Sequence, residues 1–305
     1  MKPLPAWQLA AAAILLSLGL VAFVKRPFAE TSGPSFHYAR LHAAMGASQT
    51  RHSSLETVRA EFEKALSLDP AYADAANQLA NAYLNHGRMD DATAACRRTL
   101  EIDPAHPDAH NNLGLLLMLS GKSEEALAEF RAAIQSRPGF ADASSNLGYT
   151  LMRLGRLQDG EAELRRAIES GAGINARHNL ALCLMAQGRK KEASDQYAEN
   201  LRTSPAHLAS LNDLAWLLAT ANESELRAGQ KALELARQAD ALSGGKDPLV
   251  RHTVAAALAE NGQFDDAALT ARQAAELATA AGNPSLASMI QKQAETYSRC
   301  QPWRE

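Results

Sequence analysis

Three observations predict that the 305-residue chain is all-α, a solenoid of antiparallel helix pairs that follows an N-terminal transmembrane helix. Residues 73–106 superpose on residues 107–140 when one stretch slides over the other, and a period of about 34 residues indicates a helical repeat array. Alanine is abundant and only 5% of residues are aromatic, which suits helices that pack closely through small side chains. The third observation is an apolar run near the N-terminus.

That run, residues 6–24, is almost entirely apolar and is stopped by Lys25 and Arg26. As a helix it would span roughly 28 Å at about 1.5 Å per residue, close to the roughly 30 Å hydrocarbon core of a membrane. A cleaved signal peptide is the alternative, but its hydrophobic region is usually shorter and ends in a small-x-small site, which residues 20–22 match poorly. We therefore expect residues 1–26 to be an uncleaved, single-pass anchor.

The side of the membrane on which the rest of the chain lies is not decided by charge. Lys2 and the amino terminus balance Lys25 and Arg26, so the positive-inside rule gives no clear orientation. Our expectation is a bacterial cell membrane with the repeats on the extracytoplasmic side. Residues 27–35, rich in Pro, Gly, Ser and Thr, are expected to be a linker.

The array is expected to occupy residues 36–298, followed by a tail at 299–305. Its first unit would have a helix from Phe36 to Met45, a loop from Gly46 to Ser54, and a second helix from Leu55 to Leu68. The sixth unit lacks a turn glycine and carries about five extra residues. The predicted units are 36–72, 73–106, 107–140, 141–173, 174–207, 208–247 and 248–281, with a capping helix at 284–298.

Each unit places one apolar stripe on each of its two helices. Leu79, Ala80 and Tyr83 are three and four residues apart, so they share a helical face. Ala92, Cys96 and Thr99 form the facing stripe on the second helix of the same unit. A glycine between the helices permits the positive φ of a tight turn. One pair cannot bury its stripes alone, so neighbouring units stack and share a core.

These small-residue, turn-glycine and closing-proline positions resemble the tetratricopeptide repeat, most specifically over 73–140. The resemblance covers roughly 36–282 and implies a right-handed superhelix in which first helices line a concave groove and second helices form the convex side. It also implies that the protein binds partner proteins or peptides. The irregular first unit, the glycine-closed fourth unit and the insertion in the sixth depart from the pattern.

By this resemblance, a row of amides would lie in the groove. The slot before the core leucine holds Gln78, Asn112, Asn146, Asn179 and Asp213, and Asn77 and Asn81 stand beside it. An amide offers both a donor and an acceptor, so such a row can bind the backbone of an extended peptide. The same asparagines can equally be part of the repeat's consensus structure, and both interpretations stay open.

An apolar row would run next to the amides. Flexible methionines beside aromatic rings suit an adaptable peptide groove. We expect Tyr149 and Trp216 to contact a ligand, whereas Leu115 and Leu182 more plausibly pack between neighbouring first helices. The methionines of the row are Met118, Met152 and Met185.

The sequence predicts no catalytic site, metal or cofactor. His106 and His110 have the spacing of paired zinc ligands, but Pro107 places His106 in a loop and no acidic third ligand is evident. Relatives that bind chaperones hold the partner's C-terminal carboxylate with lysine, arginine and asparagine at set positions of the groove. In this chain those positions contain no Lys or Arg, so we do not expect this binding mode; they hold Asn77, Asn81, Asn112, Asp142 and Asn146. Cys96 and Cys183 are expected to be packing residues and Cys300 an exposed thiol.

The near-neutral net charge of -3 gives no reason to expect a nucleic-acid partner. The predicted function is therefore a non-enzymatic, membrane-tethered scaffold that binds partner peptides in the groove. The alternative is an accessory subunit of a cell-envelope enzyme or assembly system, such as glycosyl transfer or cytochrome maturation.

Overall fold

The computed structural model describes residues 34–49 and 54–305, and these form fifteen α-helices and one short 3-10 helix. The helices are α2 (Pro34–Gln49), α3 (Leu55–Leu68), α4 (Ala73–Asn85), α5 (Met89–Ile102), α6 (Pro107–Leu119), α7 (Ser123–Ser136), α8 (Ala141–Arg153), α9 (Leu157–Glu169), α10 (Ile174–Ala186), α11 (Lys190–Thr203), α12 (Leu208–Thr220), η1 (Ser224–Leu226), α13 (Gly229–Leu242), α14 (Pro248–Glu260), α15 (Phe264–Ala280) and α16 (Pro284–Tyr297).

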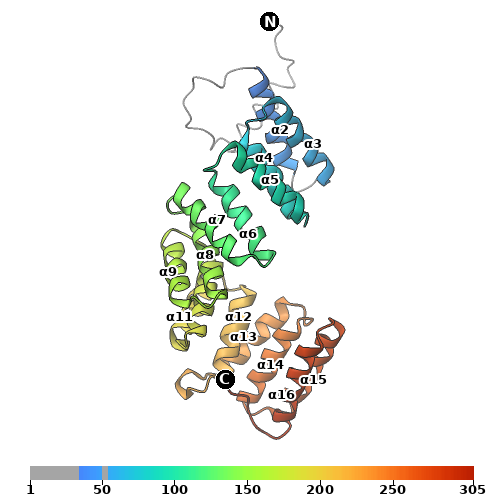
Figure 1. Cartoon of the computed structure of the whole chain (residues 1–305). Coiled ribbons are helices and arrows are strands. Elements are labelled where there is room, and N and C mark those ends of the chain that lie inside the picture. The colour runs from blue at the N-terminus through green and yellow to red at the C-terminus, as the bar shows by residue number, and fades with distance from the viewer. Residues whose placement is uncertain (1–33, 50–53) are drawn as a thin grey trace.

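The helices are arranged as consecutive antiparallel pairs that stack into an elongated, curved array (Figure 1). Each pair, such as α6 with α7, packs against the next pair along the chain, and neighbouring first helices also touch one another. The all-α solenoid expected from the sequence is therefore confirmed. The chain's C-terminal end does not extend beyond α16 but returns to lie beside α12 (Figure 1).

Most turns within a pair are closed by a glycine in the left-handed conformation. After α4, Gly87 has φ +70°, its N–H bonds to Leu84 O, and the Arg88 N–H bonds to Tyr83 O at 2.9 Å. These two bonds satisfy helix-terminal carbonyls in the manner of a Schellman motif. The same arrangement recurs after α6, α8, α10 and α14, at Gly121, Gly155, Gly188 and Gly262.

Two helices of the fourth unit approach so closely that their backbones touch. A Cβ added at Gly148 of α8 would lie 2.9 Å from the carbonyl oxygen of Gly160 in α9, and one at Gly160 would lie 2.9 Å from the oxygen of Gly148. Backbone atoms cannot move aside as a side chain can. Gly114 differs, because its added Cβ would meet only the ring of Phe130.

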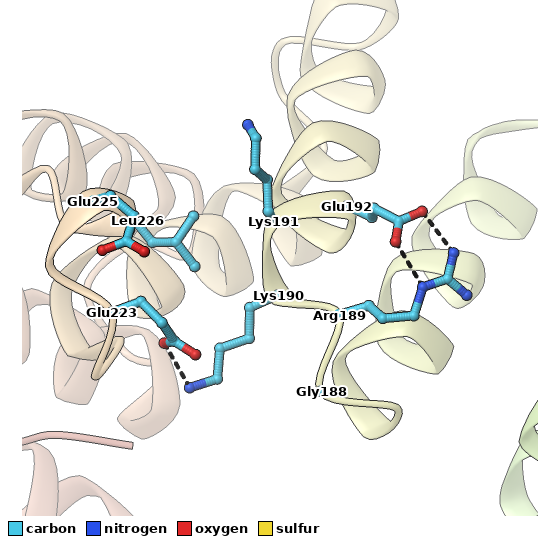
Figure 2. A pocket seen from close by; sticks show the side chains of 8 residues that line it. All are labelled: Gly188, Arg189, Lys190, Lys191, Glu192, Glu223, Glu225 and Leu226. Carbon is cyan, nitrogen blue, oxygen red and sulfur yellow. Dashed lines mark hydrogen bonds and ion pairs between the residues drawn. The ribbon is translucent and has the colours of Figure 1, made fainter.

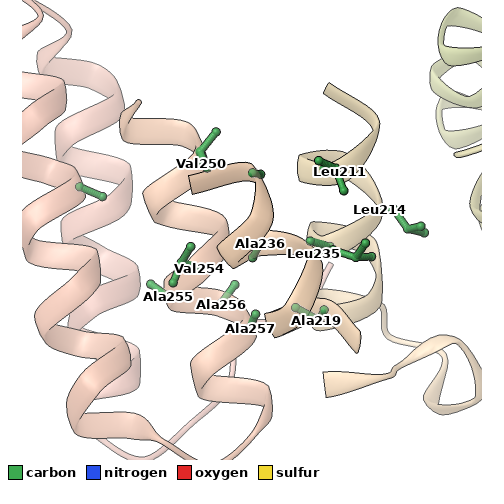
Figure 3. Close-up of a cluster of buried hydrophobic side chains, with 14 of the residues drawn as sticks. Leu211, Leu214, Ala219, Leu235, Ala236, Val250, Val254, Ala255, Ala256 and Ala257 are labelled. Carbon is green, nitrogen blue, oxygen red and sulfur yellow. The ribbon is translucent and has the colours of Figure 1, made fainter. Parts of the chain in front are cut away.

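The apolar core runs along the array as three clusters, which contain Phe62, Phe130 and Tyr197 respectively. Small residues dominate where helices approach closely: Figure 3 shows Ala255, Ala256 and Ala257 of α14 beside residues of α12 and α13. Cys96 and Cys183 are buried and Cys300 is exposed, as expected.

The beginning of the array differs from expectation. Helix α2 begins at Pro34 and continues to Gln49, whereas the sequence predicted a helix from Phe36 to Met45 and a loop from Gly46. Alanine and glutamine favour helix, and a single interior glycine costs only about 1 kcal/mol, so Gly46 does not end the helix.

The expected membrane anchor, with its apolar run 6–24, falls within residues 1–33, which lie outside the described residues. Across 34–49 and 54–305, no helix is both long and apolar enough to cross a membrane.

Candidate functional site

The residues expected in a groove all lie on the first helices of their pairs. We call this surface the first-helix face, meaning the side of α4, α6, α8, α10 and α12 that presents the amide row and the apolar row. Most of its members are half-buried, and Asn77 alone among them is almost fully buried, at 3% exposed. The face consists of Asn77, Gln78, Asn81, Asn112, Met118, Asn146, Tyr149, Met152, Asn179, Met185 and Trp216.

At its N-terminal end, the amides of this face bond to one another. Asn112 Nδ2 of α6 donates to Asn77 Oδ1 at 3.1 Å and to Asn81 Oδ1 at 2.8 Å, both on α4. One unit later, Asn146 Nδ2 donates to Asn111 Oδ1 at 2.9 Å. A buried amide needs partners, so these bonds tie neighbouring first helices together. Asn77 and Asn112 therefore have a structural role, which is to join neighbouring repeats.

Two amide side chains of the first-helix face do not take part in such hydrogen bonds. In the described part of the chain, the side chains of Gln78 and Asn179 make no hydrogen bond, and both are half-buried. Asn146 uses one N–H and keeps its oxygen for another donor. The amides that can bind a partner are therefore concentrated on α8 and α10, with Gln78 apart from them.

The apolar row continues along the same helices. Met118 packs on the core, and its sulfur accepts from Thr150 Oγ1 at 3.3 Å, so it is held by the neighbouring helix. Tyr149 is half-buried, and its hydroxyl accepts from Arg153 at 3.2 Å. Met152 and Met185 lie at the edge of the core with part of their surface exposed. Tyr149, Met152 and Met185 thus lie on the same two helices as Asn146 and Asn179.

At the C-terminal end of the first-helix face, the side chain of Trp216 already contacts other residues of the chain. Its indole Nε1 donates to Glu305 Oε2 at 2.9 Å, and its ring lies 4.5 Å from the ring of His252. Sequence reasoning placed a ligand here but treated residues 299–305 only as a tail. The available signal was Trp303 after Pro302, in a chain with only three tryptophans.

A polar cluster joins α10, α11 and α12 and superficially resembles a catalytic triad. His178 approaches Ser210 Oγ at 3.4 Å and Asp213 at 3.6 Å, and His207 Nδ1 lies 2.8 Å from the same Oγ. Burial, with His207 nearby, lowers the pKa of His178 to about 4, and burial raises the pKa of Asp213. Ser210 is completely buried, so no substrate can reach its oxygen. The cluster joins the units through buried hydrogen bonds.

The histidine pair at His106 and His110 has structural roles. His106 caps α6, where its Nδ1 accepts from the Ala109 N–H at 3.2 Å and its Nε2 lies 3.1 Å from Asp74. His110 bonds to Glu129 at 2.6 Å. No group of three or more His, Cys, Asp or Glu within the described residues has the geometry to hold a metal ion.

An open cleft of about 250 Å³ lies between the start of α11 and the η1 loop (Figure 2). Its charges are mostly paired: Lys190 bonds to Glu223 at 3.0 Å, and Arg189 bonds to Glu192 at 2.6 Å. Lys191 points away from both pairs in Figure 2, and its side chain is 79% exposed. The walls of the cleft are charged, with Glu192, Glu223 and Glu225 among the lining residues, and no serine, cysteine or histidine of the described residues lines it.

Comparison with known proteins agrees with this geometry. Two family models described as tetratricopeptide repeat match the chain, one over 101–139, 111–176 and 145–207 and the other over 55–116. Together they cover residues 55–207, half of the chain. A search of curated proteins found no match.

Solved structures show the same fold at low identity. The Cut9–Hcn1 hetero-tetramer of the APC/C matches with a TM-score of 0.68 and 15% identity, over 93% of this chain and 51% of that one. The pilF protein of Pseudomonas aeruginosa matches with a TM-score of 0.61 and 24% identity, over 73% of this chain and 98% of that one. Tetratricopeptide repeat proteins generally mediate protein–protein interaction. From the family models and the repeated helix pairs together, this chain belongs to the tetratricopeptide repeat family.

Proposed function

We propose that the protein is a non-enzymatic, membrane-tethered scaffold that binds an extended segment of a partner protein on the first-helix face of α8 and α10. The observation that carries the proposal is the combination of uncommitted amides, at Asn146 and Asn179, with an apolar row on the same two helices. Tyr149, Met152 and Met185 supply that row.

The chemistry of this surface matches an extended peptide. A peptide backbone alternates donors and acceptors, and an amide side chain can satisfy one of each. Asn179 has its whole amide available, and Asn146 retains an acceptor oxygen. Methionines can adapt to different apolar side chains, and an aromatic ring gives a large contact area with little loss of conformational freedom.

The experiment compares the partners captured by the full chain and by the double variant Asn146→Ala/Asn179→Ala. Asn112 is left intact, because its loss would disturb the packing of α4 against α6. Gln158→Ala is the matched control, since Gln158 is an exposed amide residue on the second helix α9, away from the first-helix face. The proposal requires the double variant to lose partners that the control retains. Identical partner sets would refute it.

The membrane tether is a separate part of the proposal. It rests on residues 6–24, whose length and apolar character suit a membrane span, with Lys25 and Arg26 at its end. An extracytoplasmic array predicts that protease added outside intact spheroplasts digests residues 34–305. Protection from that protease in intact spheroplasts, with digestion after lysis, would place the array on the cytoplasmic side. Release from membranes by alkaline carbonate would argue against a span.

A further inference from the structure

The end of α12 differs from the ends of α4, α6, α8, α10 and α14 because no glycine closes it. Its C-cap is Ala221, with φ -52° and ψ 137°. The last four carbonyls of a helix have no partner inside the helix. Here Leu217 O accepts from the Ala221 N–H at 3.1 Å, and Leu218 O accepts from the Ala228 N–H at 3.0 Å. The carbonyls of Ala219 and Thr220 are left to other donors.

Residues 301–305 supply those donors. Arg304 Nη1 donates to Ala219 O at 3.2 Å, and the Glu305 N–H donates to Thr220 O at 2.8 Å. In return, the Asn222 N–H donates to Glu305 O at 3.1 Å. This exchange across residue 221 is the pattern made by two parallel extended strands. The unclosed end of α12 therefore binds the backbone of an extended segment.

Side chains add specificity to the backbone contacts. Trp303 is partly buried against the core cluster that contains Tyr197. Arg304 Nη2 forms an ion pair with Glu260 of α14 at 2.6 Å, and a cation at the C-terminal end of α12 is also favoured by the helix dipole. Trp216 donates to the Glu305 side chain, and Lys190 Nζ donates to Glu305 O at 2.8 Å.

We propose that the ends of α12 and α14, together with Lys190, form a second peptide-binding site, specific for an extended segment with an aromatic, an arginine and an acidic residue in succession. Residues 301–305 are its intramolecular ligand, and a partner segment of the same chemistry displaces them. The site shares no contact with Asn146 or Asn179, so this proposal can be tested independently of the proposed function.

The tether strengthens the internal ligand. Only residues 298–300, which form a hydrogen-bonded turn, separate the end of α16 from the bound segment, and a short tether gives an effective concentration on the order of millimolar or more. A separate peptide that makes the same contacts must therefore reach comparable concentrations to compete. Weakening the internal ligand should expose the site and raise the apparent affinity for that peptide about tenfold or more.

Cys300 allows the segment to be observed in the full chain. It is the exposed cysteine of the three, whereas Cys96 and Cys183 are buried and burial raises the pKa of the Cys96 thiol to about 12, so a nitroxide reagent should label Cys300 selectively. The probe ligand is the acetylated peptide Gln-Pro-Trp-Arg-Glu. We expect an immobilised nitroxide spectrum in the unmodified chain and a mobile one after millimolar peptide is added.

Substitutions of residues that form the contacts of segment 301–305, and of one residue that does not, test the proposal. Trp303→Ala/Arg304→Ala should give a mobile spectrum and bind fluorescein-labelled peptide at least about tenfold more tightly than the unmodified chain. Lys190→Ala, on a different element, should shift the spectrum toward the mobile form. Lys191→Ala is its matched control, because Lys191 does not contact residues 301–305, and it should leave the spectrum unchanged.

Three results would overturn the proposal: a mobile label in the unmodified chain, equal peptide affinity with and without Trp303 and Arg304, or the same spectrum for the Lys190 and Lys191 variants. If the double variant lost its helical circular dichroism, the Lys190 and Lys191 pair would still decide, since neither lies in the bound segment. A peptide with Trp replaced by Ala should fail to mobilise the label. If it succeeded equally, the aromatic specificity would be refuted.

Discussion

The regular units over 73–207 and the sixth unit, at the start of the C-terminal part over 208–305, use the same helix pairs but close them differently. In the regular part, glycines such as Gly188 let the chain turn tightly, and the turn's own N–H groups satisfy the last carbonyls of each first helix. In the C-terminal part, α12 ends at Ala221 and its last carbonyls are satisfied by a segment that lies more than 80 residues further along the chain.

The consequence of this difference lies on the first-helix face. Where turns close on themselves, the face of α8 and α10 presents side chains, including Asn146 and Asn179, with bonding capacity left for a partner. Where the turn stays open, backbone groups become the binding site and the chain occupies it itself. The missing glycine and the longer connection after α12 thus change what kind of group is available for recognition.

The strongest test of the regular packing is Gly148→Leu. Its side chain would have to enter the contact between the backbones of α8 and α9, where even a Cβ lies 2.9 Å from Gly160 O. We expect a loss of about 3 kcal/mol, the upper end of ordinary overpacking. Thermal unfolding followed by circular dichroism measures this loss. Gly114→Ala is the comparison, because the Phe130 ring can shift, and equal melting temperatures for both variants would contradict the proposed packing.

The junction between the two regions should be sensitive to acid. Burial holds the pKa of His178 at about 4 in the folded chain against about 6.5 when unfolded, so the unfolded state takes up the proton first. Stability should therefore be intact above pH 6.5 and fall as the pH drops toward 4. The loss should be about 2 kcal/mol, reduced from the full shift because the side chain keeps some contact with water. Urea unfolding at pH 7.5 and 4.5 would show a smaller loss for His178→Gln, and an equal loss would contradict this assignment.

The amide bonds at the N-terminal end of the face can be separated from the amides proposed for binding. Asn112→Ala leaves the buried Asn77 oxygen without its donor and should cost about 1.5 kcal/mol. Asn179→Ala removes no hydrogen bond within the described residues and should change stability by less than about 0.5 kcal/mol. Denaturant unfolding compares them, and a larger loss for Asn179→Ala would reverse the roles assigned to the two residues.

The glycine-closed turns and the end of α12, which has no glycine, each predict a small change in stability on substitution. Gly188→Ala forces a side chain to φ +75° and should cost about 1 kcal/mol. Ala221→Gly keeps an ordinary φ and should cost up to about 1 kcal/mol through the added freedom of the unfolded chain. Ala221→Gly should also increase hydrogen exchange at the Glu305 amide, whereas Gly188→Ala should not. Stabilisation by Ala221→Gly would mean that a glycine turn suits this position after all.

Much of the fold follows from local signals that the sequence carries. The period, the turn glycines and the proline at the start of α6, α14 and α16 act within a few residues, so they can be read without the structure. The sequence predicts the end of α2 wrongly, because a lone Gly46 resembles a helix stop signal but the helix continues to Gln49. The close approach of Gly148 to Gly160 was indicated by the small-residue slots.

The binding surface was harder to predict, because which of its side chains remain available for a partner depends on contacts between residues distant in the sequence. A row of asparagines looks uniform in the sequence, yet Asn112 is committed to its neighbours while Asn179 is not. Trp216 had the position of a ligand-binding residue, but nothing near it in sequence indicates that Glu305 would reach it. Such pairings are set by the path of the whole superhelix.

Site-specific photo-crosslinking in native membranes tests the central claim most directly, with a benzophenone amino acid in place of Met152, Met185 or Leu269. Leu269 is 54% exposed on the second helix α15 and serves as the off-face control. The account predicts a protein adduct from positions 152 and 185 that disappears in the Asn146→Ala/Asn179→Ala background, and none of that mass from position 269. The same adduct from position 269, or adducts from 152 and 185 that survive the double substitution, would contradict it.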